Sequence, residues 1–104
     1  METRLRLKEV VRGKILYYLA LIYPKAATLP LLQGELDLFG YPLLMEELQF
    51  HVAYLTEKGL VASEGVESSP MKRRVTLVKI TARGIDVYDG RLPAEEGVYL
   101  EPRA

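Results

Sequence analysis

A chain of 104 residues, 49% of them hydrophobic and 27% charged, can bury one hydrophobic core but is too short to bury two. It contains no cysteine, which excludes disulfides, thiolate metal sites and cysteine nucleophiles. Fourteen Lys and Arg residues balance fourteen Asp and Glu residues, so any affinity for DNA must come from local patches of charge.

Neither a membrane span nor a secretory signal is expected. The longest apolar run, Ile15 to Tyr23, is far shorter than the ~20 residues that a spanning helix needs. The N-terminus alternates in charge and has no cleavage site of small residues. We therefore expect a cytoplasmic protein.

The first helix is predicted from about Leu5 to Tyr23, where Pro24 disfavours continuation. Apolar residues recur there at the spacing of one buried face: Val11, Ile15, Leu19 and Ile22. Tyr17 and Leu21 add apolar surface on other faces, which must also be covered. A second subunit could cover them, which predicts a homodimer; the last helix or the C-terminal tail is the alternative.

A second helix is predicted from Thr28 to Leu38, since Thr28 can cap its start and Pro30 is tolerated in a first turn. Residues 39–41 form a turn, and Pro42 is expected to open a third helix that ends at Lys58. Two helices joined by a short turn form a helix-turn-helix, and the third helix then has the position of a recognition helix.

The helical wheel divides the third helix into two faces. The face expected in the core contains Leu44, Leu48, Val52 and Leu55. The outer face contains Glu46, Gln49, Phe50, Ala53 and Glu57, with Glu47 and Tyr54 at one border. Only Gln49 suits base recognition, because this face contains no Arg or Lys for guanine and Gln49 is its one side chain that suits adenine. The three glutamates would repel phosphates. Phe50 and Tyr54 are typical of a protein-contact surface, with partial burial against the first helix as the alternative.

A β-hairpin follows. Gly59 is expected to close the third helix, a strand starts over Leu60 to Glu64, and residues 66–70 form the turn. The branched residues of Arg73 to Ile80 predict the returning strand. Thr81 can cap a last short helix that ends near Gly90.

The hairpin has a basic edge that favours DNA. Lys72, Arg73 and Arg74 can contact phosphates or enter a narrow groove, with Ser68 and Ser69 as neutral donors. Arg73 and Arg74 point to opposite faces of a strand, so they cannot both contact the same surface. The alternative is that these charged side chains form a solvated face of the hairpin without a binding role.

Signatures of an enzyme are not found. His51 lies four residues after Glu47, and a single such pair makes a poor metal site. We expect a partly packed His51 paired with Glu47 instead. No phosphate-binding loop is present. The sequence therefore predicts a non-enzymatic protein without cofactor, metal or small-molecule ligand.

The segments L-T-E-K-G-L-V at 55–61 and I-T-A-R-G-I-D at 80–86 resemble the recognition-helix exit and the segment after the wing in small bacterial winged-helix regulators of the MarR, PadR and ArsR-like groups. The resemblance extends more loosely over residues 7–90, and short winged-helix proteins of Mu-like prophages are similar too. It implies a winged fold and DNA binding in transcription regulation.

The sequence thus predicts an α+β fold that is mainly α with a small β-hairpin. Residues 1–90 would form a winged helix-turn-helix domain in the order helix, helix, helix, strand, strand, helix. Residues 91–104 would form a tail that is either docked or disordered. The predicted function is a DNA-binding transcriptional regulator whose partner is double-stranded DNA. The alternative is a protein interaction or dimerisation module that does not bind DNA, given the acidic outer face of the third helix.

Overall fold

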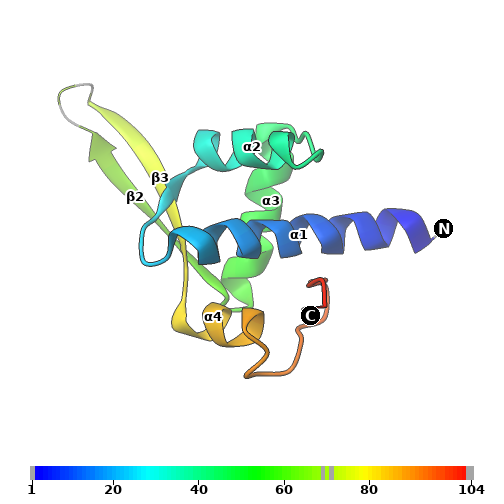
Figure 1. Cartoon of the computed structure of the whole chain (residues 1–104). Helices are drawn as coiled ribbons and strands as arrows, with labels where there is room; N and C mark the ends of the chain where they lie inside the picture. The colour runs from blue at the N-terminus through cyan, green and yellow to red at the C-terminus, as the bar shows by residue number, and fades with distance from the viewer. Residues whose placement is uncertain (1, 69, 71, 103–104) are drawn as a thin grey trace.

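The computed structural model describes residues 2–68, 70 and 72–102, and it confirms an α+β fold (Figure 1). Within these residues the elements are, in chain order, α1 (Glu2–Ile22), β1 (Ala27–Thr28), α2 (Leu29–Leu38), α3 (Met45–Glu57), β2 (Val61–Ser68), β3 (Arg73–Ile80) and α4 (Ala82–Tyr88). The strands form an antiparallel sheet in the order β1-β3-β2.

The strand β1 was not expected between the first two helices. Ala27 pairs with Val78 and Thr28 with Leu77, so that the chain joins the free edge of β3 on its way from α1 to α2. A strand of two residues is too short to show a period in the sequence, and only its distant partner stabilises it.

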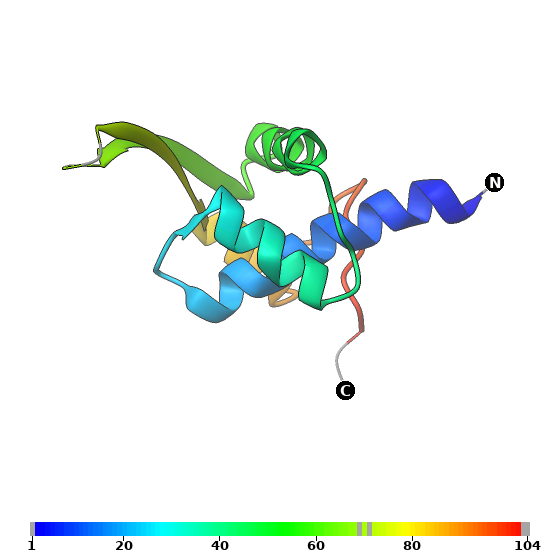
Figure 2. The ribbon, with the colours of Figure 1, turned by 90° about the horizontal axis from the view of Figure 1, so that it is seen from above.

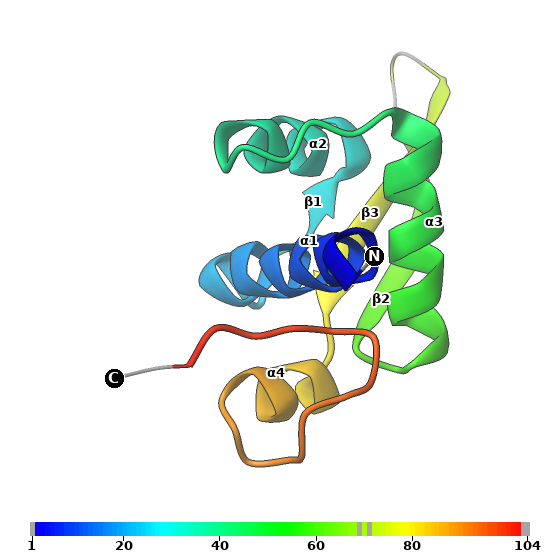
Figure 3. The ribbon, with the colours of Figure 1, turned by 90° about the vertical axis from the view of Figure 1, so that its right-hand side faces the viewer.

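Helix α1 lies at the centre of the helical layer. Figure 3 looks along it, with α2 on one side, α3 beside it and α4 on the side opposite α2. Its predicted stripe is largely confirmed, because Val11, Ile15 and Leu19 are buried, while Ile22 is only half-buried. Leu16 is buried as well, since α1 is covered from more than one direction.

The start of α2 agrees with the sequence, and the start of α3 does not. Thr28 caps α2, its Oγ1 accepting a hydrogen bond from the Leu31 N–H at 3.2 Å. Helix α3 begins at Met45 rather than Pro42, because the Glu47 carboxylate accepts the N–H of Leu44 at 2.9 Å and fixes that residue as the cap. Leu44 is therefore 66% exposed and not part of the core, which contradicts its assignment to the buried face.

The hairpin of β2 and β3 is longer than expected and projects from the helices (Figure 1). Its register runs from Val61 opposite Ile80 to Ser68 opposite Arg73. The predicted turn at 66–70 is thus wrong in its first half, because cross-strand pairing extends β2 as far as Ser68. The limits of β3 are confirmed, and Thr81 caps α4 by accepting the Gly84 N–H at 3.0 Å.

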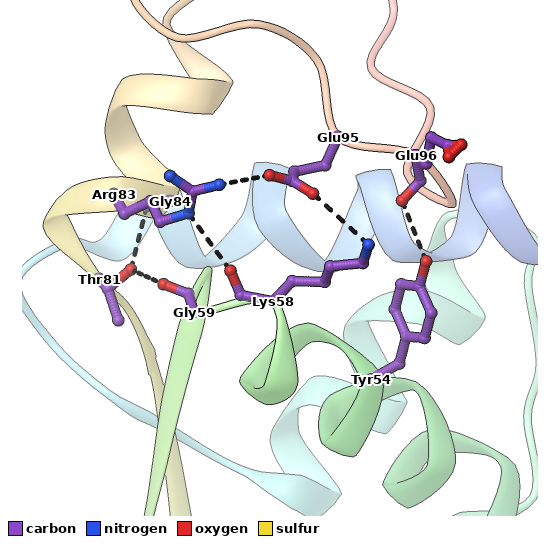
Figure 4. A network of polar contacts seen from close by, with 8 residues as sticks. All are labelled: Tyr54, Lys58, Gly59, Thr81, Arg83, Gly84, Glu95 and Glu96. Atoms are coloured by element: carbon purple, nitrogen blue, oxygen red, sulfur yellow. Dashed lines mark hydrogen bonds and ion pairs between the residues drawn. The ribbon is translucent and has the colours of Figure 1, made fainter.

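The described part of the tail, residues 91–102, is docked. It runs back beside α1 (Figure 3), where the Tyr99 N–H donates to the Glu9 carbonyl at 3.0 Å and Val98 enters the core. Figure 4 shows its polar contacts with α3 and α4. Glu95 forms ion pairs with Lys58 and Arg83, and the Tyr54 hydroxyl donates to the Glu96 carbonyl at 3.0 Å. The tail therefore packs against the same core as residues 1–90.

Candidate nucleic-acid interface

A groove of about 410 Å³ separates the hairpin from the first turns of α2 and α3. Gln49 and Met45 line it on the α3 side, and Arg73 and Arg74 line it on the β3 side. Three of the residues that sequence reasoning selected for DNA contact therefore surround one groove. Both arginines line it, which contradicts the expectation from strand alternation that they cannot contact the same surface. Gln49 and both arginines are exposed, so their polar ends are available to a ligand.

The Arg74 side chain lies against Gly65 of the neighbouring strand, a contact that was not predicted from the sequence. By strand alternation it shares a face of the sheet with the buried residues Val78 and Ile80, which is the face towards the helices. A Cβ atom built on Gly65 would lie 2.7 Å from Arg74 Nη2, so the guanidinium lies across this glycine. Glycine within a strand is a known sign of such a close approach, and Gly65 could have been noticed for this reason.

The tip of the hairpin adds Lys72, which is exposed and has a left-handed backbone with φ 54°. Its charge extends the basic edge formed by the two arginines. The predicted DNA contacts of Ser69 and of the Ser68 side chain lie outside the described part of the structure.

The outward face of α3 is acidic, as the wheel predicted. Glu46, Gln49, Phe50, Ala53 and Glu57 are all exposed there. Because the carboxylates repel phosphate, this face is poorly suited to a DNA backbone. Gln49 differs from them in lying at the edge of α3 next to the hairpin arginines.

The four residues considered for protein contacts fall into two groups. Tyr17 packs against Phe39 and Tyr88, with ring centroids 5.9 Å and 6.3 Å away, and Tyr54 is held by the tail. These two aromatic residues thus have contacts within the chain. Leu21 and Phe50 are 63% and 59% exposed and have large apolar surfaces free for a partner.

His51 is buried and has Arg12 as its partner, not Glu47 as expected. The Arg12 Nε donates to His51 Nδ1 at 3.1 Å, while Glu47 is engaged in capping α3. Burial first, then the Arg12 charge and the Lys8 charge, lower the pKa of His51 to about 4. Arg12 was missed because its partners are distant in sequence, although its position on α1, three residues before Ile15 and next to Val11 of the buried face, is a signal.

The described residues contain no group of three or more His, Cys, Asp or Glu side chains that could hold a metal ion. None of their helices combines the length and apolar character needed to cross a membrane.

Comparison with known proteins identifies no relative. The chain matches no protein-family model, no curated protein and no solved structure.

Proposed function

We propose that this chain is a winged helix-turn-helix domain that binds double-stranded DNA and regulates transcription. In this proposal α2 and α3 form the helix-turn-helix, and the hairpin of β2 and β3 is the wing. The observation that carries the proposal is the groove that places Gln49 of α3 opposite Arg73 and Arg74 of β3. The resemblance of segments 55–61 and 80–86 to winged-helix regulators also supports it.

Each side of the groove would have its own task. The guanidinium groups of Arg73 and Arg74 suit phosphate oxygens, and contacts to phosphate position a protein on DNA without reading its sequence. Gln49 can form a pair of hydrogen bonds with the edge of adenine. Glu46 and Glu57 disfavour a central approach of α3 to the backbone. Binding would therefore depend on the hairpin and on the edge of α3 beside it.

The test is a titration of generic duplex DNA at two salt concentrations. Binding through phosphates must weaken steeply with salt, because each contact releases condensed counterions. A protein that shows no binding at low salt would contradict the proposal.

Single arginine variants probe the wing. Arg74→Ala and Arg73→Ala should weaken binding to all sequences, and each that removes a phosphate contact should reduce the salt slope by about one. Lys79→Ala is the matched control, since Lys79 is an exposed cation of the same strand far from the groove. If Lys79→Ala lowers the slope as much as the arginine variants, binding is a general charge effect and not a property of the groove.

Gly65→Ala tests whether the contact between Arg74 and Gly65 matters for DNA binding. The new methyl group would meet the far end of a flexible side chain, so that Arg74 swings away and the fold is kept. We expect a thermal unfolding midpoint near that of the wild type and a loss of DNA affinity no larger than that of Arg74→Ala. In the double variant with Arg74→Ala, Gly65→Ala should have no further effect on affinity. Additive losses in this double-mutant cycle would show that Gly65 acts through something else.

A protein interaction module is the second candidate. The exposed Phe50 on an acidic helix face favours it, because aromatic residues are enriched in interface hot spots. Its expected result is the opposite of the first: a partner binds through Phe50, and generic DNA does not bind at low salt.

A further inference from the structure

A second groove, of about 430 Å³, lies on the other edge of α3, between α3 and the N-terminal half of α1. Leu7, Lys8 and Val11 line it from α1, and Glu46, Glu47 and Phe50 line it from α3. Leu7 is 49% exposed and Phe50 is 59% exposed, so two large apolar side chains face solvent at its rim. Exposed apolar surface of this kind, flanked by charges, is typical of an interaction site.

The charges on the two walls are of opposite sign. Lys8 supplies a cation on the α1 wall, and Glu46 and Glu47 supply carboxylates on the α3 wall. Within the described residues Lys8 and Glu46 form no ion pair, either with each other or with another side chain. Both signs of charge are therefore available to a partner.

We propose that a second copy of this chain docks in this groove and forms a twofold dimer. In a twofold interface residue i contacts j and j contacts i, so a surface must complement itself. A groove with a basic wall and an acidic wall meets this condition, because the rotation places Lys8 of one protomer opposite Glu46 of its partner, and the reverse. Leu7 of each protomer would then pack against the partner's Phe50.

The shape of the molecule favours such a partner. Figure 2 shows the N-terminal part of α1 projecting beyond the other helices. The projecting segment of each protomer can reach α3 of the other. This interface differs from the expected one, in which a second subunit covers Tyr17 and Leu21, since Tyr17 already packs against Phe39 and Tyr88.

The inference does not depend on the proposed function. The dimer uses the edge of α3 that faces α1, whereas DNA would use the edge that faces the hairpin. Failure of DNA binding and failure of dimerisation are therefore separate results, read from different experiments on different variants.

The test is sedimentation equilibrium of the full chain at micromolar to millimolar concentration. We expect a dimer whose dissociation constant rises about tenfold or more in Phe50→Glu. Leu21→Glu is the matched control, because Leu21 is exposed to a similar extent, 63% against 59% for Phe50, but lies at the C-terminal end of α1 and does not line this groove, so it should leave the dimer unchanged. Circular dichroism checks that each variant is folded.

A charge swap tests the pairing itself. Lys8→Glu and Glu46→Lys should each weaken the dimer, and the double variant should restore it. Both positions are exposed, so neither change threatens the core. A wild-type protein that is monomeric over the whole range overturns the proposal. So does dissociation by Leu21→Glu but not by Phe50→Glu, or a double variant as weak as the worse single variant.

Discussion

Acidification from pH 7 to pH 4 is expected to lower the free energy of unfolding by roughly 3 kcal/mol through His51 alone, since its pKa falls from 6.5 to about 4 on folding. His51 is 5% exposed, and its Nδ1 must be unprotonated to accept the hydrogen bond from Arg12 Nε. The folded protein therefore resists protonation at this site.

The direction follows from proton uptake. In the unfolded chain His51 takes up a proton as the pH falls through 6.5, whereas in the folded protein it remains neutral until about pH 4. The unfolded state thus binds more protons within this window, and stability falls as the pH falls. Well above pH 6.5 His51 is neutral in both states, so it no longer lowers the free energy of unfolding.

Urea unfolding at pH 7, 5.5 and 4 measures this effect. His51→Gln is the control, because a glutamine oxygen can still accept from Arg12 but does not titrate. The carboxylates titrate alike in both proteins, so the difference between the two stability curves isolates His51. Parallel curves between pH 7 and pH 4 would refute the prediction.

Arg12 explains the unusual environment of the buried His51. Arg12 is itself buried, no carboxylate of the described residues pairs with it, and its guanidinium lies 3.8 Å from the centroid of the Tyr54 ring. Its Nη1 donates to the Gly97 carbonyl at 3.1 Å. Cation, ring, imidazole and tail carbonyl therefore form one cluster that joins α1, α3 and the tail. A proton on His51 would remove an acceptor from this cluster and add a like charge to it.

The parts of the fold that the sequence predicts well are those with local causes. Thr28 and Thr81 cap their helices through hydrogen bonds to residues three positions later, and the branched residues of β3 favour a strand by themselves. Pairing with distant residues leaves no pattern in the local sequence. For that reason β1 was missed, and His51 was paired with its helical neighbour Glu47 instead of Arg12, 39 residues away.

In the candidate site, too, the residues could be selected from the sequence, whereas their arrangement in space could not. Gln49, Arg73 and Arg74 could be selected from residue type and from their positions on a helix and a strand. That they surround one groove depends on how the hairpin packs beside α3, which no local pattern specifies. The helical wheel considers one helix alone and therefore predicts an interface role for Tyr54. In the folded chain the C-terminal tail contacts this residue instead.

Gly13→Ala is expected to undock the tail while leaving the rest of the fold intact. A Cβ atom at this position would lie 1.8 Å from the Tyr99 carbonyl oxygen and 2.9 Å from the carbonyl carbon. These are backbone atoms, so no rotation of a side chain relieves the clash. The Tyr99 N–H is also tied to the Glu9 carbonyl, one turn earlier on α1, which holds the tail against the helix at this point.

The same change should not weaken α1 itself, because alanine stabilises a helix interior by about 0.5–1 kcal/mol relative to glycine. We therefore expect unchanged helical circular dichroism, together with exchange of the Tyr99 amide hydrogen at least about tenfold faster than in the wild type, since that amide loses its acceptor. Gly34→Ala is the matched control: Gly34 also lies within a helix, and a Cβ atom there has nothing within 4 Å. It should leave the exchange of Tyr99 unchanged. If the Tyr99 amide of Gly13→Ala stays as protected as in the wild type, the close approach of α1 and the tail does not hold the tail in place.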